Sequence, residues 1–374
     1  MVDWQSNRLD KILAKVSEPV QVDPNKLYRE IGVRSHGKGV FHKDPIFGSE
    51  LGSKRVFWVK TDVLVLNIVF AWEQALAVTA ETENGFIASH RFPMFLPKNN
   101  LCSIQFLKFL FLTKRGKTYL ELASPGGAGR NKTLGQKNFD ELKVTIPTID
   151  EQTKIANFLT AVDEKIQHLT QKADLLAQYK KGVMQQIFSQ ELRFKDDDGG
   201  EFAEWEEAML GDVLDYEQPT KYLVSSTEYD DSYETPVLTA GKTFVLGYTD
   251  EVNGIFEHGL PVIIFDDFTT AFKFVTFPFK AKSSAMKILK LNSASNNIKF
   301  IYEVMGILDL PTGDEHKRYW ISEYSKLLFQ LPCLKEQTKI ATFLTAIDDK
   351  ITHTQTQLAA VKQYKQGLLQ QMFV

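Results

Sequence analysis

One stretch of the sequence occurs twice, and it constrains the fold more than any other feature. Residues 147–166 read PTIDEQTKIANFLTAVDEKI, and residues 332–351 read PCLKEQTKIATFLTAIDDKI. The second copy follows the first at an offset of 185 residues, which holds without a gap as far as Phe188 and Phe373. A repeat of this length indicates that the chain contains two copies of one structural unit.

Both copies carry the apolar pattern of a long helix. In the first copy, apolar residues follow one another at spacings of three and four from Ile155 to Ile187, and the second copy repeats this series with few changes. A narrow apolar stripe of this length is typical of a coiled-coil seam. We therefore predict two long spacer helices, within residues 147–190 and 332–374.

A second repeated feature marks the start of each half. The pattern Trp-x4-Leu-x2-(Ile/Val)-Leu begins at Trp4 and again at Trp205. Each half therefore opens on a tryptophan segment, continues through a globular region and closes on a long helix. This organisation predicts globular domains at residues 1–146 and 205–331, with a charged, glycine-ended linker at residues 191–204.

The globular regions have the composition of mixed α/β domains. Residues 63–70 and 261–265 are rich in β-forming side chains and predict buried strands, whereas residues 101–115 predict a short helix. We therefore predict an α+β fold class: two mixed α/β globular domains separated by an antiparallel coiled coil of two long helices, as a pseudo-two-fold internal repeat. In that arrangement the chain would end near Trp4, just as the first helix would end near Trp205.

Cysteine usage and hydropathy indicate the cellular setting. Cys102 and Cys333 are the only cysteines, too few for a disulfide framework or a structural zinc site. No signal stretch is visible at the N-terminus, and the apolar run 56–72 is interrupted by Lys60 and Asp62, so it does not resemble a membrane span. We expect a cytoplasmic location.

Charge is distributed unevenly between the two globular regions. The net charge is −3 for the whole chain, +7 for residues 1–146 and −10 for residues 199–331. Because nucleic acid attracts basic surfaces, the first region fits DNA binding better than the second. The second would need a local basic patch on an acidic body.

The motifs that support catalysis are missing. The glycine-rich loop 126–133 lacks the glycine that precedes the lysine of a phosphate-binding P-loop, because Asn131 stands before Lys132. The acidic clusters at residues 163–165 and 348–350 fall on the predicted helices, where such charges usually face solvent. There is no Pro-Pro dipeptide, so the Asp/Asn-Pro-Pro-aromatic site of amino-methyltransferases is absent, and the seven histidines show no metal-ligand spacing. We predict no catalytic residue, metal or cofactor in this chain.

The duplicated motifs support a family resemblance. The paired Pro-x3-Glu-Gln-x-Lys-Ile-Ala-x-Phe-Leu segments and the paired tryptophan openings resemble the DNA-specificity subunit of type I restriction–modification systems. This resemblance implies that the two globular regions are target recognition domains, each reading one half of a bipartite DNA site. It also implies that the helices set the spacing of the half-sites. Two modification subunits would supply S-adenosylmethionine and methylate adenine, and motor–nuclease subunits would join them for restriction.

Candidate contacts follow from charge and position. The run Arg34-Ser-His-Gly-Lys38 gathers donors that could read guanine edges or hold phosphate, and the glycine-rich loop could let the backbone approach a phosphate. For each candidate the alternative is an ordinary solvated charge, and Trp72 is interpreted as a core residue rather than a stacking one. The candidate DNA-binding residues are Arg34, His36, Lys38, Arg130, Lys132, Lys242, Thr243, Lys317 and Arg318.

Three lysines on the predicted helices are candidates for the interface with modification subunits: Lys154, Lys165 and Lys339. Two other functional classes remain open. The acidic second domain would suit a coiled-coil scaffold that presents two protein-interaction domains, and an enzyme with an unrecognised active site is a third possibility.

Overall fold

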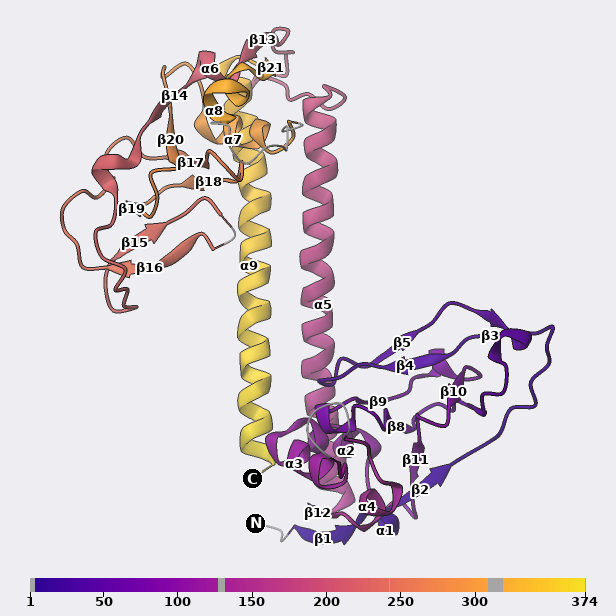
Figure 1. Ribbon diagram of the computed structural model, residues 1–374. Helices are drawn as coiled ribbons and strands as arrows, with labels where there is room; N and C mark the ends of the chain where they lie inside the picture. The colour runs from indigo at the N-terminus through magenta and orange to yellow at the C-terminus, as the bar shows by residue number, and fades with distance from the viewer. Residues whose placement is uncertain (1–3, 127–131, 242, 309–318, 374) are drawn as a thin grey trace. The chain divides into compact units, whose positions relative to one another are not determined.

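A computed structural model describes residues 4–126, 132–241, 243–308 and 319–373 (Figure 1). The chain divides into two compact units. Unit 1 comprises residues 1–171 and 355–374, and unit 2 comprises residues 172–354. Each unit therefore contains one globular region together with a part of each long helix.

Unit 1 is built from short strands and few helices. Its globular part contains the strands β1 (Gln5–Arg8), β2 (Leu13–Val16), β3 (Leu27–Tyr28), β4 (Ile31–Val33), β5 (Val40–His42), β6 (Ile46–Phe47), β7 (Val56–Trp58), β8 (Leu64–Leu66), β9 (Leu76–Val78), β10 (Ile87–Ser89), β11 (Met94–Pro97) and β12 (Lys143–Ile146). Its helices are α1 (Leu9–Ile12), α2 (Ile104–Leu112), α3 (Lys114–Leu122) and α4 (Gln136–Glu141), with short 3-10 turns η1 (Gly48–Leu51), η2 (Ala71–Glu73) and η3 (Glu81–Glu83).

Unit 2 repeats this plan. Its strands are β13 (Glu206–Met209), β14 (Leu214–Glu217), β15 (Thr235–Leu238), β16 (Val245–Thr249), β17 (Val262–Asp266), β18 (Phe272–Val275), β19 (Lys280–Ala281), β20 (Met286–Leu291) and β21 (Leu328–Leu331). Its helices are α6 (Leu210–Val213), α7 (Ile298–Met305) and α8 (Tyr319–Ser322), with the 3-10 turns η5 (Pro219–Tyr222) and η6 (Tyr324–Lys326). The two long helices are α5 (Ile149–Phe188) and α9 (Leu334–Met372).

The two units share their sheet topology. The main sheet of unit 1 has the strand order β2-β11-β8-β9, and that of unit 2 has the order β14-β20-β17-β18, with antiparallel neighbours throughout. In each unit the tryptophan segment continues into a strand that pairs with the strand preceding a long helix, as β1 with β12 and β13 with β21. The predicted α+β fold class, with two mixed α/β regions, two long helices and an internal repeat, is confirmed.

The strand predicted at residues 261–265 is present as β17, whereas the strand predicted at residues 63–70 is shorter than its apolar run. Within residues 63–70 only β8 is extended, and residues 67–70 form turns that lead into η2. The predicted helix at residues 101–115 is two helices, because Thr113 closes α2 and its side chain caps α3 by accepting from the Gly116 amide at 2.9 Å. Hydrophobicity alone does not show where such a break falls.

The repeated Glu-Gln pair explains how each long helix is fixed to its globular region. Gln152 and Gln337 are fully buried, and each side-chain amide donates to the carbonyl of the motif's own proline at 2.8 Å. Each side-chain oxygen accepts from the backbone amide of an N-cap residue, Ser103 of α2 at 2.9 Å and Asn297 of α7 at 2.8 Å. The glutamine therefore joins the start of the long helix to the start of a domain helix.

The neighbouring glutamates anchor the tryptophan segments. The Trp4 indole donates to Glu151 at 3.3 Å, and the Trp205 indole donates to Glu336 at 3.0 Å. A buried indole N–H needs such an acceptor. The tryptophan opening and the Glu-Gln motif are thus two parts of one packed junction, which accounts for their joint repetition in the sequence.

The end of each long helix also meets a tryptophan. In unit 1 the rings of Trp4 and Phe373 lie 6.3 Å apart, and in unit 2 those of Trp205 and Phe188 lie 6.4 Å apart, both edge to face. Phe188 and Phe373 occupy equivalent positions of the repeat. The expected return of the chain to Trp4, and of the first helix to Trp205, is therefore present in the structure.

Within each unit the long helices run antiparallel. In unit 1 Lys365 of α9 forms an ion pair with Asp163 of α5, while Phe373 lies beside the tryptophan that holds Glu151. In unit 2 Lys180 of α5 bonds Asp348 of α9 at 2.7 Å. No helix in the described part of the chain has the length and hydrophobicity needed to cross a membrane.

Candidate nucleic-acid interface

The basic run near the N-terminus forms the tip of a β-hairpin. Residues 34–39 connect β4 to β5, and the Arg34 amide donates to the Gly39 carbonyl at 3.0 Å. His36, Gly37 and Gly39 have φ values of 60°, 63° and 82°. A left-handed backbone at three positions makes a sharp turn, which suits glycine and is unusual for histidine. The turn leaves the side chains of Arg34, His36 and Lys38 exposed.

Hydrogen bonds hold this hairpin tip against the η2 turn. The His36 amide donates to the Glu73 carbonyl at 2.8 Å, and the Gly37 amide donates to the Gln74 carbonyl at 3.0 Å. The Ser35 hydroxyl donates to the Glu73 carboxylate at 2.8 Å. With its backbone fixed at both residues, the tip presents its basic side chains on a preorganised support, which lowers the entropic cost of binding a ligand.

Lys132 joins the same neighbourhood from a distant part of the sequence. Its ammonium lies 5.3 Å from the centre of the Trp72 ring, a cation–π distance. Trp72 belongs to η2 and is half-buried, with its indole donating to the Val69 carbonyl at 3.1 Å. The structure therefore places Lys132 next to the turn that supports the hairpin. Trp72 is not a fully buried core residue, and its indole N–H is already bonded within the chain.

A hollow of about 400 Å³ lies beside the hairpin tip. Arg34, His36 and Lys38 line it. The Arg34 guanidinium lies 4.7 Å from the centre of the Phe41 ring, which fixes the arginine by stacking. Sequence reasoning missed four other lining residues: Lys43, Asn67, Phe70 and Phe92. Phe70 and Asn67 sat inside a predicted strand, so no sequence signal placed them at a surface.

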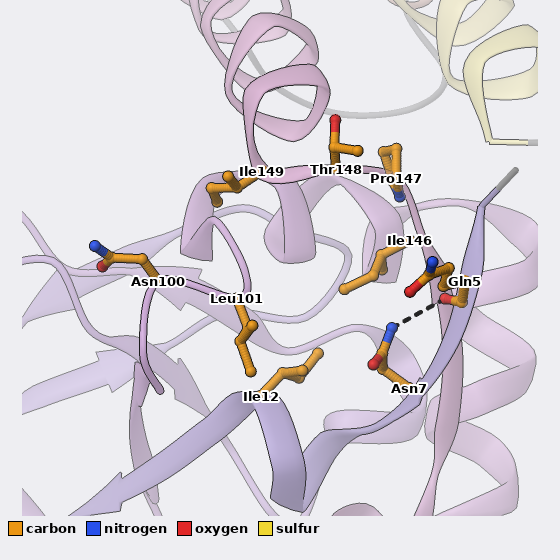
Figure 2. A pocket seen from close by; sticks show the side chains of 9 residues that line it. All are labelled: Gln5, Asn7, Ile12, Asn100, Leu101, Ile146, Pro147, Thr148 and Ile149. Carbon is orange, nitrogen blue, oxygen red and sulfur yellow. Dashed lines mark hydrogen bonds between the residues drawn. The ribbon is translucent and has the colours of Figure 1, made fainter. Parts of the chain in front are cut away.

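Another hollow in unit 1 has different chemistry. It lies where β1, β12 and the start of α5 meet, and Figure 2 shows amide and aliphatic side chains around it. One hydrogen bond joins the Asn7 amide to the Gln5 carbonyl at 3.1 Å. With no charged side chain in its lining, this hollow is poorly suited to phosphate, and it contains none of the candidate DNA-binding residues.

Most candidates from the second half lie outside the described residues, namely Lys242, Lys317 and Arg318, as does Arg130 in the first half. Thr243 is described and exposed, and its carbonyl accepts from the Thr239 hydroxyl at 2.9 Å. It lies in the connection between β15 and β16, which pair as antiparallel strands.

Part of the positive charge of unit 2 is buried. Lys280 pairs with Glu251 at 2.9 Å, Lys287 pairs with Asp267 at 3.3 Å, and both lysines are almost completely buried. Neither can contact a phosphate. Lys282, which sequence reasoning passed over, has its amide bonded to the Leu238 carbonyl at the start of the β15–β16 connection.

The three interface candidates differ in their surroundings. Lys154 and Lys165 are exposed on α5. Lys339 is half-buried, because it forms an ion pair with Asp197 at 2.7 Å and donates to the Lys195 carbonyl at 2.8 Å. No cluster of three potential metal ligands occurs among the residues that the structure describes.

Comparison with known proteins identifies the family. A family model described as "Type I restriction modification DNA specificity domain" matches residues 63–178 and 203–363. The chain is 49% identical over 160 residues to the specificity subunit of the type I restriction enzyme EcoR124I/EcoR124II of Escherichia coli, a match that covers 40% of this chain and 39% of that one. It is 23% identical over 300 residues to a putative type I restriction enzyme MjaX specificity subunit of Methanocaldococcus jannaschii, covering 73% of this chain and 68% of that one.

Solved structures show the same fold. The S subunit of a type I restriction–modification system from M. genitalium superposes with a TM-score of 0.68 at 14% identity, over 100% of this chain and 96% of the other. A chain from a study of complex assembly in the type I restriction–modification system has a TM-score of 0.51 at 15% identity, over 99% and 97% of the two chains. The resemblance inferred from the repeated motifs is confirmed, and the chain belongs to the family of type I restriction–modification DNA specificity domains.

Proposed function

We propose that this chain is a non-catalytic DNA-specificity subunit that recognises a bipartite target. Two modification subunits would bind S-adenosylmethionine and methylate adenine at that target, and motor–nuclease subunits would cleave DNA where the system includes them. The chain itself needs no cofactor for this role, and its place of action would be the cytoplasm. The family match and the duplicated α/β unit support the proposal.

The β4–β5 hairpin is the observation that carries the proposal. It exposes Arg34, His36 and Lys38 on a tip whose backbone is hydrogen-bonded to η2. Arginine can form two parallel bonds with guanine, whereas lysine usually contacts phosphate as a point charge. We assign base reading to Arg34 and phosphate contact to Lys38 and Lys132.

A gel-shift titration of the chain with its modification subunits tests this assignment. Arg34→Ala should weaken binding to the cognate site by about 1–3 kcal/mol and relax the base preference at one position. Lys38→Ala should weaken binding to all sequences similarly and reduce the salt slope by about one. Lys137→Ala removes an exposed lysine of α4 and serves as the control. Wild-type binding by both hairpin variants would refute the assignment.

A scaffold that presents two protein-interaction domains is the second candidate. The burial of Lys280 and Lys287 favours it for unit 2, because it removes two cations from a region that is already acidic. The two functions differ in their response to salt. Phosphate contacts give a steep dependence of affinity on salt concentration, so DNA binding whose affinity does not change between about 50 and 200 mM salt would favour the scaffold.

A further inference from the structure

The internal repeat allows the start of α9 to be compared with the equivalent positions at the start of α5. Three residues at the start of α9, Glu336, Lys339 and Phe343, are each contacted by the linker that follows α5. Their counterparts at the start of α5, at the offset of 185, are Glu151, Lys154 and Phe158. We call these last three residues the α5 stripe.

The linker contacts on α9 have a definite chemistry. Arg193 donates to the Glu336 carboxylate through two nitrogens, at 3.3 and 3.0 Å. Asp197 pairs with Lys339 at 2.7 Å, and the Phe194 ring lies 5.6 Å from that of Phe343, edge to face. A guanidinium, a carboxylate and an aromatic ring, all from residues 193–197, therefore occupy three successive positions on one face of the helix.

The α5 stripe has the same side chains without these contacts. Phe158 is 43% exposed, whereas its counterpart Phe343 packs against the core of unit 2. Lys154 is exposed and has no ion pair among the described residues. Glu151 accepts the Trp4 indole at 3.3 Å and remains half-exposed, whereas Glu336 is fully buried beneath the arginine.

We propose that the α5 stripe is a docking site for a segment of a partner protein with the chemistry of the linker: an arginine followed directly by an aromatic residue, with an acidic residue four positions after the arginine. The arginine would form an ion pair with the Glu151 carboxylate. The acidic residue would pair with Lys154, and the aromatic ring would pack against Phe158. The proposal does not depend on whether the chain reads DNA. It differs from a general role of the helices in assembly because it names the face and the complementary groups.

A synthetic peptide of residues 190–204 supplies the probe. Fluorescence anisotropy with the full chain should show saturable binding of the labelled peptide. Phe158→Ala or Lys154→Glu should weaken this binding by about tenfold or more, because an aromatic anchor and a paired charge are the contacts that dominate small interfaces. Tyr179→Ala and Lys172→Glu change an exposed aromatic residue and an exposed lysine elsewhere on α5, and both should bind the peptide like the wild type.

A charge reversal makes the test specific for the predicted pair. A peptide carrying Asp197→Lys should bind the wild-type chain poorly and should regain affinity for the Lys154→Glu variant. Equal binding of the original peptide to the wild type, Phe158→Ala and Lys154→Glu would overturn the proposal, since the peptide would then bind elsewhere, for example at Phe343 after displacing the linker. Failure of the wild type to bind the peptide would overturn it as well.

The oligomeric state separates a partner protein from a second copy of this chain. Light scattering should give the same mass for the wild type and for Phe158→Ala. If the wild type formed a dimer that Phe158→Ala dissociated, the occupant of the stripe would be a second copy, and the assignment to a partner protein would be wrong.

Discussion

At the scale of single residues, buried polar side chains determine how the long helices begin. Gln337 has no exposed surface to speak of, yet its amide makes three hydrogen bonds, to the Pro332 carbonyl, the Asn296 side chain and the Asn297 amide. Each of these hydrogen bonds satisfies a buried polar atom that would otherwise have no partner. Such residues cannot be replaced by an apolar side chain of similar size without leaving their partners unpaired.

Replacement of Gln337 by leucine should therefore lower the free energy of unfolding of unit 2 by about 2–4 kcal/mol. Urea unfolding followed by circular dichroism would measure the loss. Gln363→Ala, at an exposed position of the same helix, should change the free energy by less than about 0.5 kcal/mol. A loss no larger for Gln337→Leu than for this control would show that the hydrogen bonds are dispensable.

A cluster of charged residues joins the two long helices to α7 in unit 2. Asp348 accepts from Lys180 at 2.7 Å and from Lys299 at 2.9 Å, and both lysines also pair with Glu303. Burial by itself raises the pKa of Asp348, but the hydrogen bonds from the two lysines outweigh this effect and lower the pKa below its ordinary value. The charged form of Asp348 is thus favoured in the folded state.

A lowered pKa makes a contribution to stability that depends on pH. It is fully present above the unfolded-state pKa of about 3.9 and is lost as the pH falls through the lower folded-state value. Asp348→Asn should therefore reduce the difference between the free energies of unfolding at pH 7 and at acidic pH, about pH 3. Chemical denaturation at both pH values would measure it, and Asp349→Asn, at the exposed neighbouring position, is the control.

At the scale of elements, two helical glycines have opposite roles. A Cβ atom on Gly116 of α3 would lie 2.0 Å from the Leu110 carbonyl oxygen and 2.4 Å from the Phe111 Cα, both backbone atoms of α2. Gly116 therefore lets α3 pack closely against the end of α2. A Cβ atom on Gly182 of α5 would meet no atom within 4 Å, apart from the helix itself.

Alanine substitutions should separate these roles. Gly116→Ala should destabilise the chain by about 3 kcal/mol or more, because backbone atoms must move apart. Gly182→Ala should stabilise it by roughly 0.5–1 kcal/mol, because alanine has the higher helix propensity. Thermal unfolding of the two variants would show shifts of opposite sign, and a shift of the same sign would contradict this reading of the glycines.

The apolar pattern of the long helices predicts which face packs but not how deeply each side chain is buried. The apolar series predicted a uniform seam, and Leu159, Leu169 and Ile187 are buried as expected. Tyr179 and Tyr364 occupy equivalent seam positions, but more than half of each side chain is exposed. Spacing along one helix identifies the face that packs, but the depth of burial at each position depends on the partner helix, which the spacing does not describe.

At the scale of the whole molecule, α5 is one continuous helix of 40 residues whose residues belong to both compact units. A helix of that length spans about 60 Å. Within the proposed function, this continuity would let the two helices set the distance between the two halves of a DNA site, because half-site spacing follows protein geometry.

Insertion of four residues into α5 after residue 171 and into α9 after residue 354 tests this spacing role. The modified sites in methylated DNA should show a longer gap between the half-sites, while the half-sites themselves keep their sequence. Sequencing of modified bases would report both. Insertion into one helix alone is the control, because it displaces one helix against the other and should abolish activity. Altered half-site sequences would mean that the helices also take part in base recognition.

The sequence by itself determined the large-scale organisation of this protein. A repeat of this length and periodicity predicts two similar units that each end on a long helix, because equivalent residues make equivalent contacts. The tryptophan openings and the Glu-Gln motifs were visible as repeats, although their mutual hydrogen bonds were not.

Only the tertiary structure decided which side chains share a surface. Lys132 and the hairpin of Arg34 both contact the short turn η2, Lys132 through Trp72 and the hairpin through Glu73, although these segments are far apart in the sequence. The burial of Lys280 and Lys287, and the linker over Lys339, were equally invisible in the sequence. Charge and spacing are properties of the chain, whereas exposure and proximity depend on long-range packing, which no local pattern encodes.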